Sequence, residues 1–241
     1  MRKMQTPKKR VLIVIPTYNE KENVAEIINK VDLSLGGACD MLFVDDASPD
    51  GTGVILEGMK SSNSRIYVMH RPGKDGLGRA YAHGLSFGVK NGYDYIFEMD
   101  ADLSHDPEYL KVMLKEFDNF DVVIGSRFMG SMENINATPF RRFISFFASR
   151  YVKYLLGLKC LDPMAGFVGY KKEVLEKIDF DNFFSKGYVF QAEIKFRCQR
   201  NGFKITEVPI IFKNRSLGDS KLRKRDMIEA LVLPWKVMIF G

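Results

Sequence analysis

Two aspartates one residue apart, Asp100 and Asp102, have the type and spacing to do chemistry. They follow an apolar run at residues 95–99, which predicts a buried strand, and Pro107 with Glu108 predicts a helix start soon after them. Two carboxylates at the end of a strand can hold a hard divalent cation through oxygen. Aspartates also cap helices, so the pair by itself leaves two interpretations open, a metal-nucleotide site and a helix cap.

Acidic side chains also follow two earlier predicted strands. Glu20 closes the turn after the apolar run at residues 11–15, and Asp45 and Asp46 follow the run at residues 41–44. Predicted helices alternate with these strands, which is typical of a doubly wound α/β fold with helices on both faces of a mostly parallel sheet. Because parallel strands end at the same edge of a sheet, we expect these five carboxylates on one rim. Their repulsion requires a cation or hydrogen-bond donors, which favours a metal-nucleotide site.

Two further features are candidates for phosphate contact. Gly73, Gly76 and Gly78 read G-x-x-G-x-G after a third predicted strand, which is not the order of a dinucleotide-binding loop. We interpret them as a flexible turn before a helix, with ligand contact as the alternative. Arg127 follows a predicted strand at residues 120–124, so it is either a phosphate-binding arginine on the same rim or a surface arginine.

The composition is that of a soluble globular protein. The chain has 241 residues, 46% of them hydrophobic, and no linker divides it. A net charge of +6 favours an anionic partner, but no nucleic-acid-binding fold signature accompanies it, so we do not expect nucleic acid. Three widely spaced cysteines predict neither disulfides nor a zinc site and are typical of a reducing cytosolic setting.

Two stretches combine apolar and basic residues. Residues 140–156 predict an amphipathic helix, which fits a membrane-interface helix and equally a core helix with a basic solvated face. The tail at residues 223–241 starts with three basic residues and is apolar after them, but it is shorter than the roughly 20 apolar residues of a membrane span. No signal peptide is visible. We expect one domain at residues 1–222 and a tail that contacts a membrane surface or a partner.

Eight short segments complete the pattern: residues 16–20 (PTYNE), 44–52 (VDDASPDGT), 76–80 (GLGRA), 99–107 (MDADLSHDP), 125–127 (GSR), 162–167 (DPMAGF), 186–191 (KGYVFQ) and 215–221 (RSLGDSK). In this order they resemble the inverting nucleotide-sugar glycosyltransferases of family 2, which have the GT-A fold. The closer resemblance is to the branch of polyprenyl-phosphate, or dolichol-phosphate, mannosyltransferases. Each segment alone is modest, but the ordered set spans nearly the whole chain and is highly specific.

The resemblance implies roles for individual residues. The positions that hold the nucleotide-sugar donor correspond to Pro16, Tyr18, Glu20, Val44, Asp45, Asp46, Asp100, Ala101, Asp102, Arg127, Arg215 and Lys221. Asp100 and Asp102 match the D-x-D element that binds Mg²⁺ or Mn²⁺. Ser104 stands where some members place a glutamine as third metal ligand, and a serine hydroxyl is a weaker one.

The same resemblance implies the catalytic set and the acceptor. Arg127 matches a phosphate-binding arginine, and Arg141 with Ser145 matches a pair that meets the acceptor phosphate. Together with the D-x-D aspartates, they would move a hexose, expected to be mannose from GDP-mannose, onto a polyprenyl phosphate with inversion. Such an acceptor is already anionic, so no strong general base is required. We expect a peripheral enzyme at the cytoplasmic membrane face.

Three alternatives stay open at this point. A family 2 transferase could use another donor, such as UDP-glucose. It could also use a non-lipid acceptor, such as a growing glycan. A subunit that binds nucleotide or lipid without catalysis is a different class of function, and the intact pair of Asp100 and Asp102 argues against it. The sequence leaves the oligomeric state open.

Overall fold

Strands and helices alternate along most of the chain. The described strands are β1 (Val11–Thr17), β2 (Asp40–Asp45), β3 (Ile66–His70), β4 (Tyr95–Glu98), β5 (Val122–Ser126), β6 (Val168–Lys171) and β7 (Ile205–Pro209). The described helices are α1 (Val24–Leu35), α2 (Thr52–Ser62), α3 (Leu77–Lys90), α4 (Tyr109–Glu116), α5 (Pro139–Leu155), α6 (Lys172–Leu175), α7 (Phe190–Arg200) and α8 (Lys224–Phe240).

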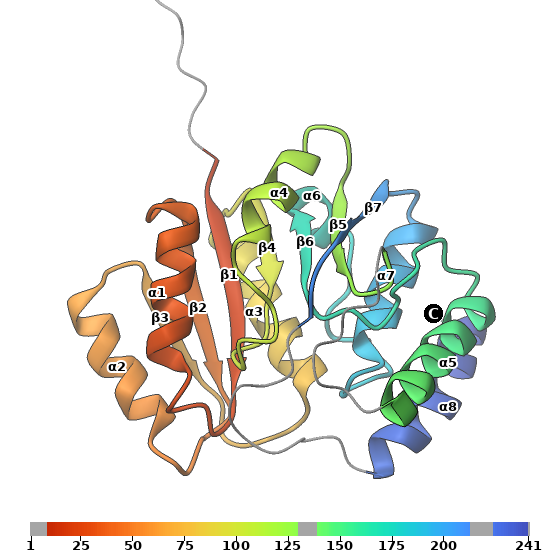
Figure 1. The fold of residues 1–241 in the computed structure, drawn as a ribbon, viewed down its shortest axis with the longest axis horizontal. Coiled ribbons are helices and arrows are strands. Elements are labelled where there is room, and N and C mark those ends of the chain that lie inside the picture. Colours follow the sequence, from red (N-terminus) through yellow and green to blue (C-terminus); the bar gives the residue numbers. More distant parts are fainter. Residues whose placement is uncertain (1–8, 130–138, 213–223, 241) are drawn as a thin grey trace, which may run out of the picture.

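The strands form one sheet in the order β3-β2-β1-β4-β6-β5-β7 (Figure 1). The computed structural model describes residues 9–129, 139–212 and 224–240, with the backbone alone at 139–145, 224–228 and 230. All described strand pairs are parallel except the two that β6 makes, with β4 and β5. The predicted doubly wound, mostly parallel α/β fold is therefore confirmed.

Alternate side chains of each central strand enter two separate apolar cores. In β1, Leu12 and Val14 join the core that includes α3 and α7, whereas Ile13 and Ile15 join the core that includes α1 and α4. All four side chains are fully buried. Burial on both faces explains why the strand reads as a continuous apolar run without alternation.

Helix α3 lies unusually close to the sheet. A Cβ placed on Gly84 would be 2.2 Å from Cγ1 of Val14, so any larger residue would push the helix off β1. The first turns of α3 lie at the carboxyl edge of the sheet, because the helix follows the carboxyl end of β3, which is parallel to β2. The contact between Gly84 and β1 fixes where Tyr81, one turn before Gly84, places its side chain.

Helix α8 covers most of the predicted tail and packs on α5. The Tyr151 hydroxyl donates to the carbonyl of Leu231 at 2.8 Å, and Nε1 of Trp235 donates to the Tyr151 hydroxyl at 2.8 Å. Val237 is fully buried in the core that includes α7. The two helices lie side by side at one end of the molecule (Figure 1).

Candidate functional site

A cavity of about 600 Å³ lies over the carboxyl ends of β1, β2 and β4. Those ends share one edge because the three strands are parallel, with Thr17 of β1 in register with Asp45 of β2. The predicted donor-binding residues that line this cavity are Pro16, Tyr18, Glu20, Asp46, Asp100, Ala101 and Asp102. The structure therefore brings together residues that lie up to 86 positions apart in the sequence.

The aspartate pair follows β4 directly and is held by dedicated donors. The buried Tyr81 hydroxyl donates to Oδ1 of Asp100 at 2.7 Å. Burial raises the pKa of Tyr81 well above its ordinary value, so this hydroxyl keeps its proton. The backbone N–H of Ser104 donates to Oδ1 of Asp102 at 3.1 Å. Both carboxylates line the cavity with one oxygen already oriented by the protein.

His105 contacts the turn that carries the aspartate pair. Its ring is buried and stacks on Phe167 with 5.2 Å between centroids. The backbone N–H of Asp100 donates to Nδ1 of His105 at 3.2 Å, which requires that nitrogen to be unprotonated. Burial lowers the pKa of His105, in keeping with a neutral ring. This histidine orients the backbone of Asp100.

The loops after the three strands each contain one non-glycine residue with a left-handed backbone. These residues are Asn19 after β1 (φ 56°), Ala47 after β2 (φ 52°) and Leu103 after β4 (φ 62°). Among the described residues they are the complete set of non-glycine positions with positive φ. Such conformations cost about 1–3 kcal/mol each and cluster at functional sites. Their grouping at one edge of the sheet marks this edge independently of the cavity.

Two predicted donor contacts face elsewhere. The side chain of Val44 is fully buried in the core, so it does not line the cavity. The Asp45 carboxylate accepts hydrogen bonds from the Thr17 and Ser48 hydroxyls at 3.0 and 2.6 Å, and from the Ser48 N–H at 3.1 Å. Asp45 therefore ties the β2 loop to β1, because its strand position turns the side chain away from the cavity.

Asp46 does reach the cavity, with an arginine beside it. Nη1 of Arg71 donates to Oδ1 of Asp46 at 2.5 Å, and both side chains are more than nine-tenths buried. Burial raises the pKa of Asp46, and Arg71 opposes that rise. The neighbouring Lys74 lies over the Tyr18 ring, with 4.1 Å between Nζ and the ring centroid. No sequence pattern had pointed to Arg71 or Lys74.

The glycine turn before α3 has the structural role expected for it. The N–H of Gly78 donates to the carbonyl of Lys186 at 2.9 Å. Gly76 has φ 101°, and a Cβ there would lie 2.2 Å from that same carbonyl. Only glycines permit this close backbone approach. It brings Lys186, whose Nζ is 3.7 Å from Asp75, into the cavity wall beside Gly76.

Arg127 forms an ion pair with the fully buried Asp162. Its Nε and Nη2 donate to the two oxygens of Asp162 at 2.7 and 2.8 Å, and its backbone N–H donates to Asp162 at 3.1 Å. Burial alone would raise the pKa of Asp162, but Arg127 outweighs it and the pKa lies below its ordinary value. The guanidinium is thus oriented by a partner 35 residues away. Its predicted contact with phosphate stays a prediction.

Four predicted site residues cannot be placed. Arg215 and Lys221 lie outside the described residues. Arg141 and Ser145 belong to α5, but their side chains are also outside the described part of the chain. Their roles stay predictions.

The oxygen donors after β4 fit a divalent cation such as Mg²⁺ or Mn²⁺. Asp100 and Asp102 present carboxylates to the cavity, and hard cations prefer such ligands. Oγ of Ser104 is buried and has no hydrogen-bond partner in the described structure, so this hydroxyl keeps its capacity to accept or coordinate. No cluster of three or more His, Cys, Asp or Glu side chains with metal-binding geometry occurs within the described ranges. Remaining ligands would come from bound phosphate and water.

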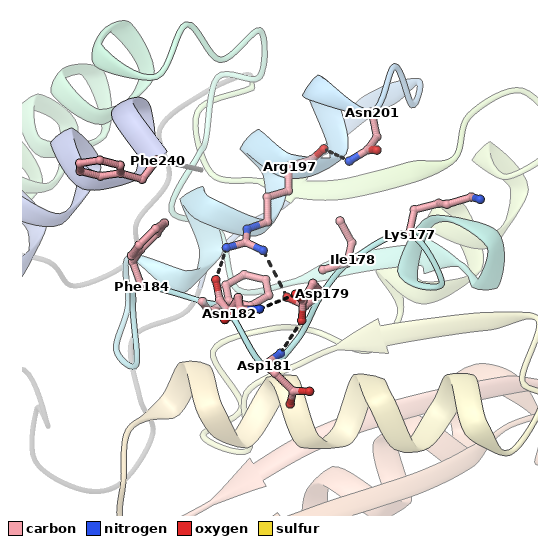
Figure 2. A pocket seen from close by; sticks show the side chains of 10 residues that line it. Lys177, Ile178, Asp179, Asp181, Asn182, Phe184, Arg197, Asn201 and Phe240 are labelled. Atoms are coloured by element: carbon pink, nitrogen blue, oxygen red, sulfur yellow. Dashed lines mark hydrogen bonds between the residues drawn. The ribbon is translucent and has the colours of Figure 1, made fainter.

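A second hollow of similar size, about 570 Å³, lies between the loop before α7 and the end of α8 (Figure 2). Arg197 donates to the carbonyls of Asp179 and Asn182 there. The Asp179 carboxylate accepts from the N–H of Asp181 and from Nδ2 of Asn182. These polar groups stabilise the loop by binding one another, so we assign the chemistry to the cavity over β4.

The pair of Asp162 and Arg127 predicts a stability effect with a definite pH dependence. At pH 7, Asp162→Asn should lower the free energy of unfolding by about 3 kcal/mol, because it leaves the Arg127 side chain, only 19% exposed, without its counter-ion. The pKa of Asp162 is depressed in the folded state, so its stabilisation is present above the unfolded value, near 3.9, and is lost in stronger acid. Urea unfolding of variant and wild type should therefore converge below about pH 4.

Glu26→Gln is the matched control, because its partner Lys30 forms an exposed i,i+4 pair. We expect a change of less than about 0.5 kcal/mol. A gap for Asp162→Asn that stays constant from pH 7 to pH 3 would contradict the assignment.

Comparison with known proteins identifies the family. The model of glycosyl transferase family 2 matches residues 12–179. Polyprenol monophosphomannose synthase of Mycolicibacterium smegmatis is 43% identical over an alignment of 241 residues, which covers 96% of this chain and 88% of the relative. Undecaprenyl-phosphate mannosyltransferase of Micrococcus luteus is 43% identical over 223 residues, covering 92% and 91%.

The fold is also similar to a solved glycosyltransferase structure. Glucosyl-3-phosphoglycerate synthase of Mycobacterium tuberculosis, in complex with Mn²⁺ and UDP-glucose, matches with a TM-score of 0.67 at 18% identity. The match covers 94% of this chain and 79% of that one. With the sequence matches and the common fold, this chain belongs to glycosyl transferase family 2.

Proposed function

We propose that this chain transfers mannose from GDP-mannose to a polyprenyl phosphate, with inversion and with Mg²⁺ or Mn²⁺ bound at Asp100 and Asp102. The observation that carries the proposal is the aspartate pair after β4, oriented toward a cavity lined by the predicted donor-binding residues. The names of the two relatives, each 43% identical over most of the chain, support mannose as the sugar and a polyprenyl phosphate as the acceptor.

The residues that line the cavity would bind different parts of the nucleotide-sugar donor. We assign Pro16, Tyr18 and Asp46, at the ends of β1 and β2, to the nucleoside, and Asp100 and Asp102 to the diphosphate; all five line the cavity. When bound, a divalent cation supplies positive charge against the negative charge that develops on the leaving diphosphate. Lys74 and Lys186 also line the cavity and supply further positive charge near it.

The transfer exchanges one bond to the anomeric carbon for another. An oxygen of the acceptor phosphate forms a bond to the anomeric carbon, and the bond to the donor diphosphate breaks with its electron pair leaving on the diphosphate. Attack from the face opposite the leaving group inverts the centre. The acceptor phosphate is anionic near neutral pH, so the protein has no proton to remove. This accords with the commitment of the buried His105 to the backbone of Asp100.

Peripheral membrane contact, expected at the cytoplasmic face, is part of the proposal. No helix in the described ranges is both long and apolar enough to cross a bilayer. The exposed apolar side chains of α5 and α8 offer a surface for contact instead. They are Phe147 and Tyr154 on α5, and Leu231, Val232, Trp235, Met238, Ile239 and Phe240 on α8. Apolar stripes of this kind lie in the interface plane of a bilayer.

The first prediction concerns turnover. Asp102→Asn should lower kcat by at least about 100-fold, because the developing charge on the diphosphate loses its main counter-charge. The assay contains Mn²⁺, a short polyprenyl phosphate and a panel of nucleotide sugars, and it measures extracted glycolipid. Glu57→Gln, an exposed acid on α2, should leave the rate unchanged.

Each outcome of that assay decides something. Wild-type turnover that survives in Asp102→Asn would remove the metal role of the aspartates. Product with UDP-glucose and none with GDP-mannose would correct the donor. No product with any donor would favour a non-catalytic subunit.

The second prediction concerns Tyr81. Tyr81→Phe deletes the hydroxyl that orients Asp100, so the Kd for Mn²⁺ in the presence of GDP should rise roughly tenfold. Titration calorimetry measures this without turnover. Tyr93→Phe is the matched control, because the Tyr93 hydroxyl donates to Asp40 at 2.6 Å, also from a buried ring but away from the cavity. An equal effect of both variants on Mn²⁺ affinity would contradict the role of Tyr81.

The third prediction concerns the membrane. Leu231→Ser with Ile239→Ser should reduce binding to polyprenyl-phosphate-free vesicles severalfold, because both side chains are well exposed, at 59% and 61%. Sedimentation with neutral and anionic vesicles measures this, and we expect tighter binding to the anionic ones. Leu33→Ser with Val54→Ser removes two apolar side chains of α1 and α2 that are even more exposed, at 73% and 79%, and should have no effect. Equal loss in both double variants would place the contact elsewhere.

A further inference from the structure

A buried network of hydrogen-bonded polar side chains lies behind the aspartate pair and is not used by the transfer described above. It joins Glu98 at the end of β4 to Gln191 and Lys195 of α7. Glu98 and Lys195 are both 0% exposed, and Gln191 is 3% exposed. Charged side chains are almost never this deeply buried unless they are paired or hydrogen-bonded.

The hydrogen bonds in this network run in one direction, from the donor Lys195 through Gln191 to the acceptor Glu98. Nε2 of Gln191 donates to Oε2 of Glu98 at 2.9 Å, which turns Oε1 of the same amide toward Lys195. Nζ of Lys195 donates to that Oε1 at 3.2 Å, to the carbonyl of Gln191 at 3.0 Å and to the carbonyl of Ala165 at 2.7 Å. An ammonium has three protons, so all of its donors are used. The shortest bond is the one that leaves α7 and reaches Ala165.

Ala165 belongs to the 162–167 turn, which packs beside Asp100. At its start, Asp162 holds Arg127. At its end, Phe167 stacks on His105, whose ring orients the backbone of Asp100. Between them Gly166 lies so close to Asp100 that a Cβ there would be 3.7 Å from Oδ2.

Stability alone is a weak reason for this arrangement. Replacing a buried charged pair by apolar residues of similar volume is often neutral or stabilising. A buried ammonium whose shortest hydrogen bond goes to the carbonyl of this turn is placed to fix the turn beside Asp100. We propose that Lys195 is a positioning residue for the transfer site: oriented by Gln191 and Glu98, it holds the 162–167 turn against the aspartate pair. This inference rests on the proposed function only in calling the site a transfer site. The contact between Lys195 and Ala165 does not depend on it.

The test uses two variants of the full chain. Lys195→Met removes the ammonium and keeps an unbranched side chain, so kcat should fall between roughly 10- and 100-fold while the KM for GDP-mannose changes less. The double variant Lys195→Met with Glu98→Gln removes both charges, so no lone buried charge remains to unfold the protein. It should regain thermal stability relative to Lys195→Met, and kcat should stay low because Ala165 still lacks its donor.

Hydrogen exchange gives a readout that does not depend on turnover. Amides of residues 162–168 should exchange faster in both variants, because the turn has lost its tie to α7. Arg197→Met is the matched control on the same helix, since Arg197 ties the loop beside the second hollow (Figure 2). It should speed exchange at residues 179–184 and leave kcat and residues 162–168 unchanged.

The outcomes separate this inference from the proposed function. Activity that returns together with stability in the double variant would overturn the positioning role and make Lys195 a stability residue only. Unchanged exchange at residues 162–168 would overturn it as well. If the wild type forms no glycolipid, the proposed function fails, and the exchange data with Mn²⁺–GDP titration still decide whether Lys195 holds the 162–167 turn.

Discussion

Carboxylates crowded at one edge of the sheet are the constraint on which the rest of this structure depends. Parallel pairing of β1, β2 and β4 brings five of them together, and like charges at short range repel strongly where water is excluded. Hydrogen-bond donors of the protein offset this repulsion. Asn23 donates to Glu20 at 2.7 Å, Ser48 and Thr17 to Asp45, and Arg71 to Asp46. Asp100 accepts a hydrogen bond from Tyr81 and Asp102 accepts one from the N–H of Ser104, and both carboxylates line the cavity, where a cation can offset their charge.

The loops that carry these acids are themselves held under strain. Asn19, Ala47 and Leu103 each adopt a left-handed backbone, one in each loop. Backbone strain of this kind persists only where the surroundings over-determine it. At Leu103 the surroundings are the hydrogen bond from Ser104 to Asp102 and the buried ring of His105. The geometry of the aspartate pair is therefore set by the folded protein in advance, which is what electrostatic stabilisation of a leaving group requires.

The fold and the rim could be predicted from the sequence because both depend on local patterns. Continuous apolar runs gave the buried parallel strands, and acids directly after them gave the shared edge. The same reasoning could not reach Asp162 or Lys195. Asp162 meets Arg127 across 35 residues, through the antiparallel pairing of β5 with β6, and no local pattern encodes that contact. Lys195 lies on a helix where a lysine is ordinarily a surface residue, and only the packing of α7 on the sheet buries it. Val44 and Asp45 lie on strand β2, whose packing directs one side chain into the core and the other toward β1, a detail that motif matching does not include.

Helix α8 connects the cavity to the surface proposed for the membrane. Glu229 lines the cavity, and the exposed apolar stripe begins two residues later with Leu231 and extends to Phe240. At 1.5 Å per residue, the stripe lies within about 16 Å of Glu229 along the helix axis. Moving a polyprenyl chain from the bilayer into water is strongly unfavourable, since each CH₂ exposed to water costs about 0.8 kcal/mol of free energy. An acceptor phosphate must therefore be met at the bilayer surface, and a cavity whose wall continues directly into an apolar stripe meets that requirement.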